Sequence, residues 1–155
     1  MIEDRLILWH PATVHYSLDD GMEITAEGGT ARVCLLAAQR PFSDEFLDFR
    51  LELHDVGLAA ATGVRTIEGD GLAVWVHALA QSYAGWDGER IWESLERDAR
   101  ISARHDGRGH VTLRFVVRGG VRGCEPDAWE ASVSVYLDAG EDMRRLADAI
   151  EAFAT

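Results

Sequence analysis

The chain of 155 residues contains no lysine and no asparagine, so its 15 Lys and Arg positions are all arginine. Against these stand 27 acidic residues, which gives a formal net charge of −12 at pH 7. Binding to nucleic acid or to an anionic membrane requires a positive surface that displaces counterions. The charge therefore predicts a protein with neither kind of partner.

Cysteine is also scarce, since only Cys34 and Cys124 are present. Two cysteines are too few for a disulfide framework. No run of residues reaches the roughly 18 apolar positions of a membrane span, and the first residues lack the basic-then-apolar order of a secretory signal. We therefore expect a cytoplasmic protein with reduced thiols, and at this length a single domain over residues 1–155.

Alternation of apolar and polar residues predicts most of the strands. The pattern is cleanest over 46–54, where the leucines and Phe49 occupy every second position. A similar alternation over 99–104 and 111–118 brackets the turn 106–109, which is the signature of a hairpin. The other expected strands are one or two short edge strands within the first 30 residues, 31–40, 58–67 and 129–137, while Trp92 and Leu95 are expected to lead into a strand.

Two segments have helical periodicity instead. Apolar residues recur at helical spacing from Leu72 to Tyr83, with Asp70 placed to cap the N-terminus. A second stripe runs from Met143 to Phe153, with Asp138 as its expected cap. The order of meander, helix, meander, helix predicts an α+β fold, in which an antiparallel sheet of about six strands carries both amphipathic helices on one face.

Arginine is concentrated between Arg97 and Arg122, where seven arginines face two acids, a local charge of +5. If both helices cover one face of the sheet, the polar residues of the alternating strands gather on the other face. Guanidinium groups beside hydroxyl groups suit the recognition of carboxylates or phosphates. This predicts a binding surface made of Arg100, Arg104, Arg114, Arg118, Ser132, Ser134 and Tyr136. The alternative is a solvated ladder of cross-strand ion pairs, in which Asp48, Glu52 and Glu130 neutralise these arginines.

A second candidate is the segment from His105 to His110, where a reversing chain brings together two imidazoles and the carboxylate of Asp106. Imidazole is a base near neutral pH and a common metal ligand. A metal site needs further ligands from elsewhere, for which His54 and His77 are candidates. The alternative is an ordinary tight turn, because Asp-Gly and a second glycine are what such a turn requires.

Four stretches resemble a family of small uncharacterised bacterial proteins, a domain of unknown function. They are Gly-Asp-Gly-Leu-Ala at 69–73, the segment 85–96, Ala-Arg-His-Asp-Gly-Arg-Gly-His-Val at 103–111, and Leu-Asp-Ala-Gly-Glu at 137–141. The likeness covers the C-terminal half closely and 46–67 loosely. The strand-helix-strand layout is more distantly similar to immunity proteins of wall-associated bacterial toxins. The resemblance implies one compact domain and supplies no catalytic residues.

We therefore expect a small binding protein without catalytic activity or cofactor, which acts on another protein, in an immunity-like or accessory role beside a bacterial effector or toxin. Its net acidity further suits a partner with cationic groups. Two alternatives stay open. One is a metal-binding protein or small hydrolase-type enzyme centred on His105, Asp106 and His110. The other is a structural homodimer, in which the arginines meet the acidic residues of a second copy.

Overall fold

The structure is a computed structural model that describes residues 13–17, 21–25, 28–42, 45–119 and 128–154. Its strands are β1 (Thr13–Ser17), β2 (Gly21–Thr25), β3 (Arg32–Gln39), β4 (Phe46–Asp55), β5 (Leu58–Ile67), β6 (Glu89–Glu93), β7 (Ala99–His105), β8 (His110–Arg118) and β9 (Glu130–Asp138). Its helices are α2 (Leu72–Gln81) and α3 (Glu141–Ala154), and a short turn, η1 (Glu68–Gly71), precedes α2.

The strands form two antiparallel sheets, one of five strands in the order β1-β2-β3-β4-β5 and one of four in the order β6-β7-β8-β9. The α+β class and the antiparallel meanders are confirmed, but the prediction of one sheet of about six strands is wrong. The chain passes through η1 and α2 between β5 and β6, so β6 starts a new sheet instead of extending the first one. Alternation reveals which residues point inward, but it does not reveal whether a helix or a second sheet covers them.

The core lies where the apolar faces of both sheets meet the apolar stripes of the helices. The predicted inward residues of β4 are all buried, as are Leu113 of β8 and Leu137 of β9. Cys34 of β3 is a buried free thiol, and burial raises its pKa; Cys124 falls outside the described residues. Burial of this continuous apolar surface is the main favourable contribution to folding.

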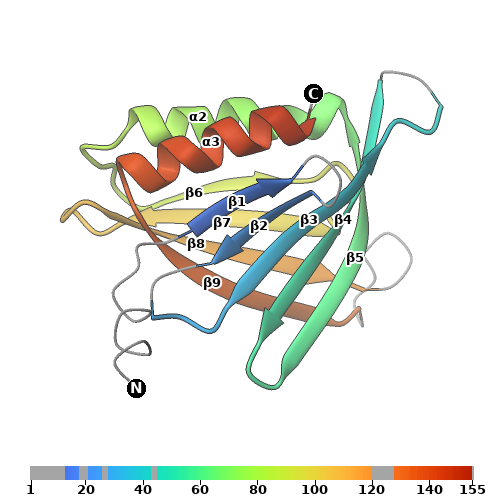
Figure 1. Ribbon diagram of the computed structural model, residues 1–155, viewed down its shortest axis with the longest axis horizontal. Helices are drawn as coiled ribbons and strands as arrows, with labels where there is room; N and C mark the ends of the chain where they lie inside the picture. The colour runs from blue at the N-terminus through green and yellow to red at the C-terminus, as the bar shows by residue number, and fades with distance from the viewer. Residues whose placement is uncertain (1–12, 18–20, 26–27, 43–44, 120–127, 155) are drawn as a thin grey trace.

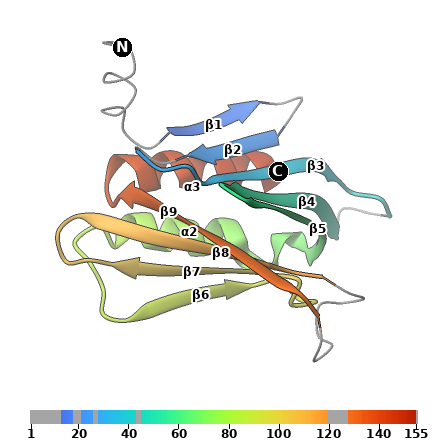
Figure 2. The same ribbon diagram turned by 90° about the horizontal axis from the view of Figure 1, so that it is seen from below.

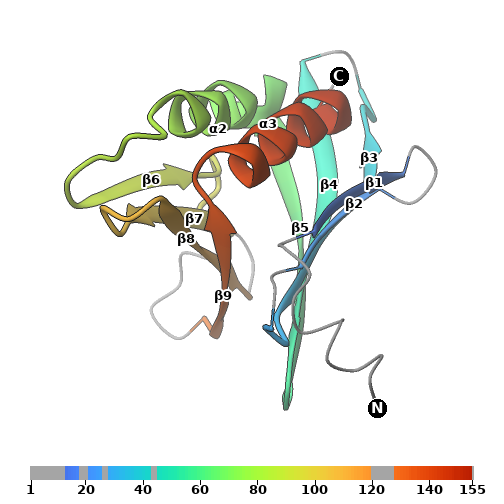
Figure 3. The same ribbon diagram turned by 60° about the vertical axis from the view of Figure 1, so that its left-hand side comes forward.

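The helices pack side by side, and both lie on the same side of the molecule (Figures 1 and 3). Helix α3 contacts β1, β2 and β9, so it bridges the two sheets. Its predicted stripe is buried, including Met143, Leu146, Ile150 and Phe153. Among the described helices, neither has the length and apolar character needed to cross a membrane.

The two predicted helix caps have different outcomes. Asp138 is confirmed, because its Oδ1 accepts hydrogen bonds from the backbone N–H groups of Gly140 (2.7 Å) and Glu141 (2.9 Å). Asp70 is not the cap of α2, because its two carboxylate oxygens accept the N–H groups of Ile67 and Leu95, which lie outside that helix; the N-cap position is occupied by Gly71, with φ of 76°. Asp70 lies one residue earlier, in a left-handed turn, and its carboxylate bonds to other segments.

Candidate functional site

The predicted binding residues lie together on the outer face of the β6–β9 sheet. In Figure 2 the helices lie behind this sheet, and no described helix or strand crosses in front of it. We use the name arginine face for the surface formed by Arg100, Arg104, Arg114, Arg118, Ser132, Ser134 and Tyr136.

Strand register explains why these residues meet. The hairpin of β7 and β8 pairs Arg104 with Thr112 and Arg100 with Val116, while Arg114 is opposite Ser102. Strand β9 then pairs Ser134 with Arg114 and Glu130 with Arg118. Because directly opposed residues project from the same face of a sheet, one face carries all four arginines, from β7 and β8, together with the hydroxyl groups of β9.

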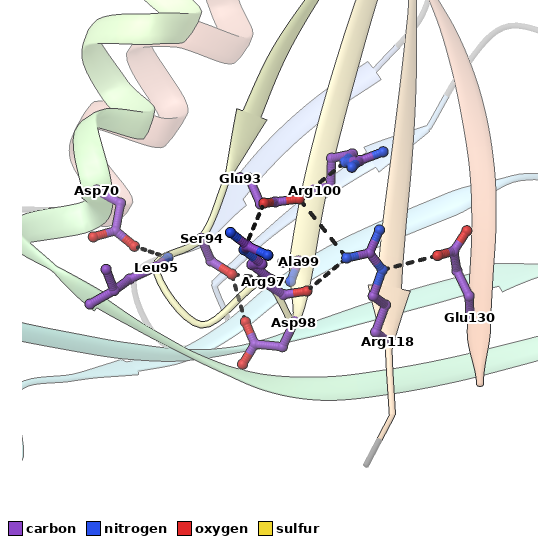
Figure 4. A network of polar contacts seen from close by, with 10 residues as sticks. All are labelled: Asp70, Glu93, Ser94, Leu95, Arg97, Asp98, Ala99, Arg100, Arg118 and Glu130. Atoms are coloured by element: carbon purple, nitrogen blue, oxygen red, sulfur yellow. Dashed lines mark hydrogen bonds and ion pairs between the residues drawn. The ribbon is translucent and has the colours of Figure 1, made fainter. Parts of the chain in front are cut away.

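Three of the four guanidinium groups already have a carboxylate partner within the chain. Arg100 Nε lies 3.2 Å from Glu93 Oε2, and Arg104 Nη2 lies 3.0 Å from Glu89 Oε2. Arg118 Nε lies 3.0 Å from Glu130 Oε2. In Figure 4, Glu93 contacts both Arg100 and Arg118, and Glu130 lies beyond Arg118.

The ladder predicted as the alternative is therefore present, but with different acids. Glu130 pairs as predicted. Asp48 instead accepts two hydrogen bonds from Arg65, and Glu52 pairs with Arg50 and His54. Asp48 and Glu52 lie on β4, in the other sheet, and the residues that take their place, Glu89 and Glu93, come from β6.

Arg114 differs from the other three arginines. It stands on β8, an interior strand of the sheet, and its Nη2 donates a hydrogen bond to Ser132 Oγ at 3.1 Å. Within the described part of the chain, no carboxylate pairs with it. Among the four arginines of this face, Arg114 is therefore the one without a carboxylate partner in the described part of the chain, and its side chain is exposed.

The turn between β6 and β7 supports the ion pairs that Glu93 forms with Arg100 and Arg118. Ser94 is buried and donates its hydroxyl hydrogen to Asp98 Oδ1 at 2.6 Å, while it accepts the N–H of Ala99 (Figure 4). Burial raises the pKa of Asp98, although the Ser94 hydroxyl favours its ionised form. The carbonyl of Asp98 also accepts the N–H of Arg118 at 3.0 Å. These hydrogen bonds within the turn and from the turn to β8 hold Glu93 and Arg118 in place.

At the opposite end of the sheet, Asp106 organises the β7–β8 turn. Its Oδ1 accepts the N–H groups of Arg108 (2.6 Å) and His110 (3.1 Å). Its Oδ2 accepts from the Tyr136 hydroxyl and from His110 Nδ1, each at 3.1 Å. Partial desolvation opposes ionisation, but these four hydrogen bonds outweigh it and lower the pKa of Asp106 to about 2.

Tyr136 is held firmly by this arrangement. Its ring stacks on the ring of His110, with centroids 5.1 Å apart and planes inclined by 15°. The hydrogen bond to Asp106 fixes the other end of the side chain. About half of the Tyr136 side chain stays exposed, so the arginine face ends in a rigid aromatic group.

The two histidines of this turn serve the turn itself. His105 Nδ1 accepts the N–H of Gly107 at 2.9 Å, and its Nε2 lies 3.0 Å from the carbonyl oxygen of Tyr83. Both nitrogens of His105 are thus engaged within the chain, while His110 Nδ1 bonds to Asp106. The geometry is that of a hydrogen-bonded turn; a metal site or an acid–base pair on His105, Asp106 and His110 stays a prediction without geometric support.

Comparison with known proteins assigns the chain to a protein family. Among curated proteins, none matches the chain. A family model described as a family of unknown function, DUF6228, matches residues 9–155. The match includes both sheets and both helices, so it extends well beyond the C-terminal segments that carried the resemblance in the sequence. The chain belongs to this family of unknown function, DUF6228.

Proposed function

We propose that the protein is a binding module without catalytic activity, and that its arginine face docks another protein by placing a carboxylate of that partner on Arg114. The single observation that carries this proposal is the exposed guanidinium group of Arg114 on an uncovered sheet face, bonded within the described chain only to Ser132. A carboxylate offers Arg114 a charge-assisted and bidentate contact that a hydroxyl does not.

The surroundings of Arg114 favour a protein as the ligand. The surface is an open sheet face, whereas small-molecule sites are concave. Arginine and tyrosine are enriched among the residues that dominate protein interfaces, and Tyr136 is rigid before any partner arrives. A side chain that is already fixed loses less conformational entropy on binding.

The charges around Arg114 also define the partner. Glu89 and Glu93 lie on edge strand β6, and Glu130 lies on β9 at the other side of the sheet. The chain as a whole carries −12. A complementary partner therefore presents one carboxylate flanked by basic groups, which suits both the centre of the face and the acidity around it. The immunity-like or accessory role stays one form of this hypothesis.

The test uses a defined peptide, with one glutamate between two pairs of arginines, titrated into isotope-labelled protein. We expect amide chemical-shift changes on β8 and β9 around Arg114. The matched peptide with glutamine in place of glutamate should bind more weakly. Arg114→Ala should remove this difference, whereas Arg144→Ala, which changes an exposed arginine of α3 paired with Glu141, should preserve it.

Shift changes that are the same for both peptides, or that Arg114→Ala leaves intact, would contradict the proposal. Affinity capture with wild-type, Arg114→Ala and Arg144→Ala protein then identifies the natural partner as a protein lost only with the first variant. If light scattering shows a dimer that Arg114→Ala dissociates, the partner is a second copy of the chain.

A further inference from the structure

A second cluster of chemically active side chains lies away from the arginine face, on the helix pair. His77 belongs to α2, and Asp148 and Glu151 belong to α3. Residues three apart on a helix project from the same face, so both carboxylates lie on one side of α3, and the neighbouring α2 brings His77 to them (Figure 1). One ligand atom from each residue lies within 4.8 Å of the other two.

This donor set suits a divalent cation of the zinc type. One imidazole nitrogen and two carboxylate oxygens are ligands that Zn²⁺ accepts at roughly 2.0–2.2 Å. Ligand atoms at that radius on a tetrahedron are about 3.3 Å apart. His77 Nε2 and Glu151 Oε2 are already 3.1 Å apart. The three side chains are partly or fully exposed, so small rotations complete the geometry and leave a fourth position for water.

The hydrogen bond between His77 and Glu151 does not explain why Asp148 lies beside them. Within the described part of the chain, Asp148 has no hydrogen-bond or ion-pair partner. Its carboxylate instead lies beside a second carboxylate, and two like charges at this distance repel each other. A divalent cation shared by both groups converts the repulsion into attraction.

A hollow adjoins His77, the ligand from α2. This residue lines a hollow of about 510 Å³ between the end of α2 and the start of α3, together with Ala80, Tyr83, Glu141 and Arg144. Because all three proposed ligands are partly or fully exposed, a metal bound between them remains accessible to water. We propose that His77, Asp148 and Glu151 form a binding site for Zn²⁺ or a similar borderline cation, which links α2 to α3.

The site is independent of the proposed function, because none of its residues lies on the β6–β9 sheet. The experiment uses tag-free, chelator-treated full-length protein and a zinc salt as the probe, with a chromophoric zinc indicator as competitor. We expect one zinc ion per chain. His77→Ala should abolish this binding, and Asp148→Asn should weaken it at least tenfold while it leaves the His77–Glu151 contact intact.

The matched control is His54→Ala, because His54 pairs with Glu52 but no third ligand joins them in the described structure. It should bind zinc like the wild type. Zinc should raise the thermal midpoint of the wild type and of His54→Ala equally, that of Asp148→Asn by a smaller amount, and that of His77→Ala not at all. Magnesium, a hard cation that prefers oxygen ligands, should have little effect.

Saturable zinc binding that is unchanged in both His77→Ala and Asp148→Asn would overturn the proposal, because the ion would then sit elsewhere. Absence of saturable binding to the wild type would overturn it as well. Circular dichroism of each variant verifies folding, which these exposed substitutions should not disturb.

Discussion

Asp70 joins three segments of the chain, and its substitution tests how the β6–β9 sheet is anchored. Its Oδ1 accepts the N–H of Ile67 at 3.0 Å, at the end of β5. Its Oδ2 accepts the N–H of Leu95 at 2.8 Å, in the turn after β6 (Figure 4). Its main-chain carbonyl accepts the indole N–H of Trp92 at 3.0 Å. The residue also has a φ of 51°, in the left-handed region.

Three substitutions separate these contributions. Asp70→Asn keeps one acceptor oxygen and tolerates the left-handed backbone, so we expect a loss of about 1 kcal/mol. Asp70→Gly removes both side-chain bonds, which are worth about 2 kcal/mol because Ile67 and Leu95 are exposed enough for water to replace the acceptor. Added freedom of the unfolded chain brings the total to about 2.5 kcal/mol. Asp70→Ala loses the same bonds and meets left-handed strain, for about 3.5 kcal/mol.

Urea unfolding, followed by tryptophan fluorescence and circular dichroism, measures these differences by linear extrapolation. The helix-cap role predicted from the sequence makes a different forecast, since glycine replaces a capping aspartate at a cost of only a few tenths of a kcal/mol. A small effect of Asp70→Gly would therefore refute the bridging role. If Asp70→Ala were no worse than Asp70→Gly, the argument from backbone strain would fail.

Two further predictions concern other carboxylates. Asp138→Ala removes the cap of α3 and should destabilise the protein by about 1 kcal/mol in urea unfolding; a loss below the error of the method would show that water replaces the cap. The pKa of Asp106 is lowered from its ordinary value of 3.8 to about 2 in the folded chain. Its ionised carboxylate should therefore stabilise the fold at pH values above about 4, and this contribution should disappear as the pH falls from about 4 to 2. Asp106→Asn should flatten that part of the acid-unfolding profile, and an unchanged slope would contradict the hydrogen bonding of the β7–β8 turn.

The sequence predicted local structure where the pattern is carried by the segment itself. Alternation located β4, β8 and β9, and helical spacing located α2 and α3. The cap at Asp138 was equally accessible, because cap and helix are adjacent in the chain. The prediction that Asp70 caps α2 was wrong for the opposite reason. Its partners include Leu95, 25 residues away, and no local pattern reveals that the turn after β6 lies beside it.

Glu89 and Glu93 were not predicted as partners of the arginines, although the sequence contains a signal for them. Strand β6 has five residues, Glu89–Glu93, with glutamates at both ends of one face. Antiparallel pairing through the short turn to β7 sets Glu93 opposite Arg100 and Glu89 opposite Arg104. A five-residue segment with one buried side chain, Trp92, is too short for periodicity to be recognised. Once the strand is assigned, however, its ion pairs follow from the register alone.

The cluster of His77 with Asp148 and Glu151 was beyond the reach of the sequence in a different way. His77 was a candidate ligand, but for the turn that contains His105 and His110. Its actual neighbour Glu151 is 74 positions further along the chain, on a second helix. Only the packing of α2 against α3 decides which carboxylates meet it, and that packing depends on both sheets.

Folding gives no evident reason for an arginine without a carboxylate partner on the arginine face. Exposed ion pairs such as Arg104–Glu89 contribute about 0–1 kcal/mol each, and a ladder with equal numbers of both charges would serve that purpose equally well. Arg114 is opposite Ser102 on β7, so its diagonal neighbours on that strand are two further guanidinium groups, those of Arg100 and Arg104. A serine hydroxyl offsets little of that repulsion. Since this guanidinium group stands on a sheet face that neither helix covers, a ligand from outside the chain is the simplest source of a carboxylate partner.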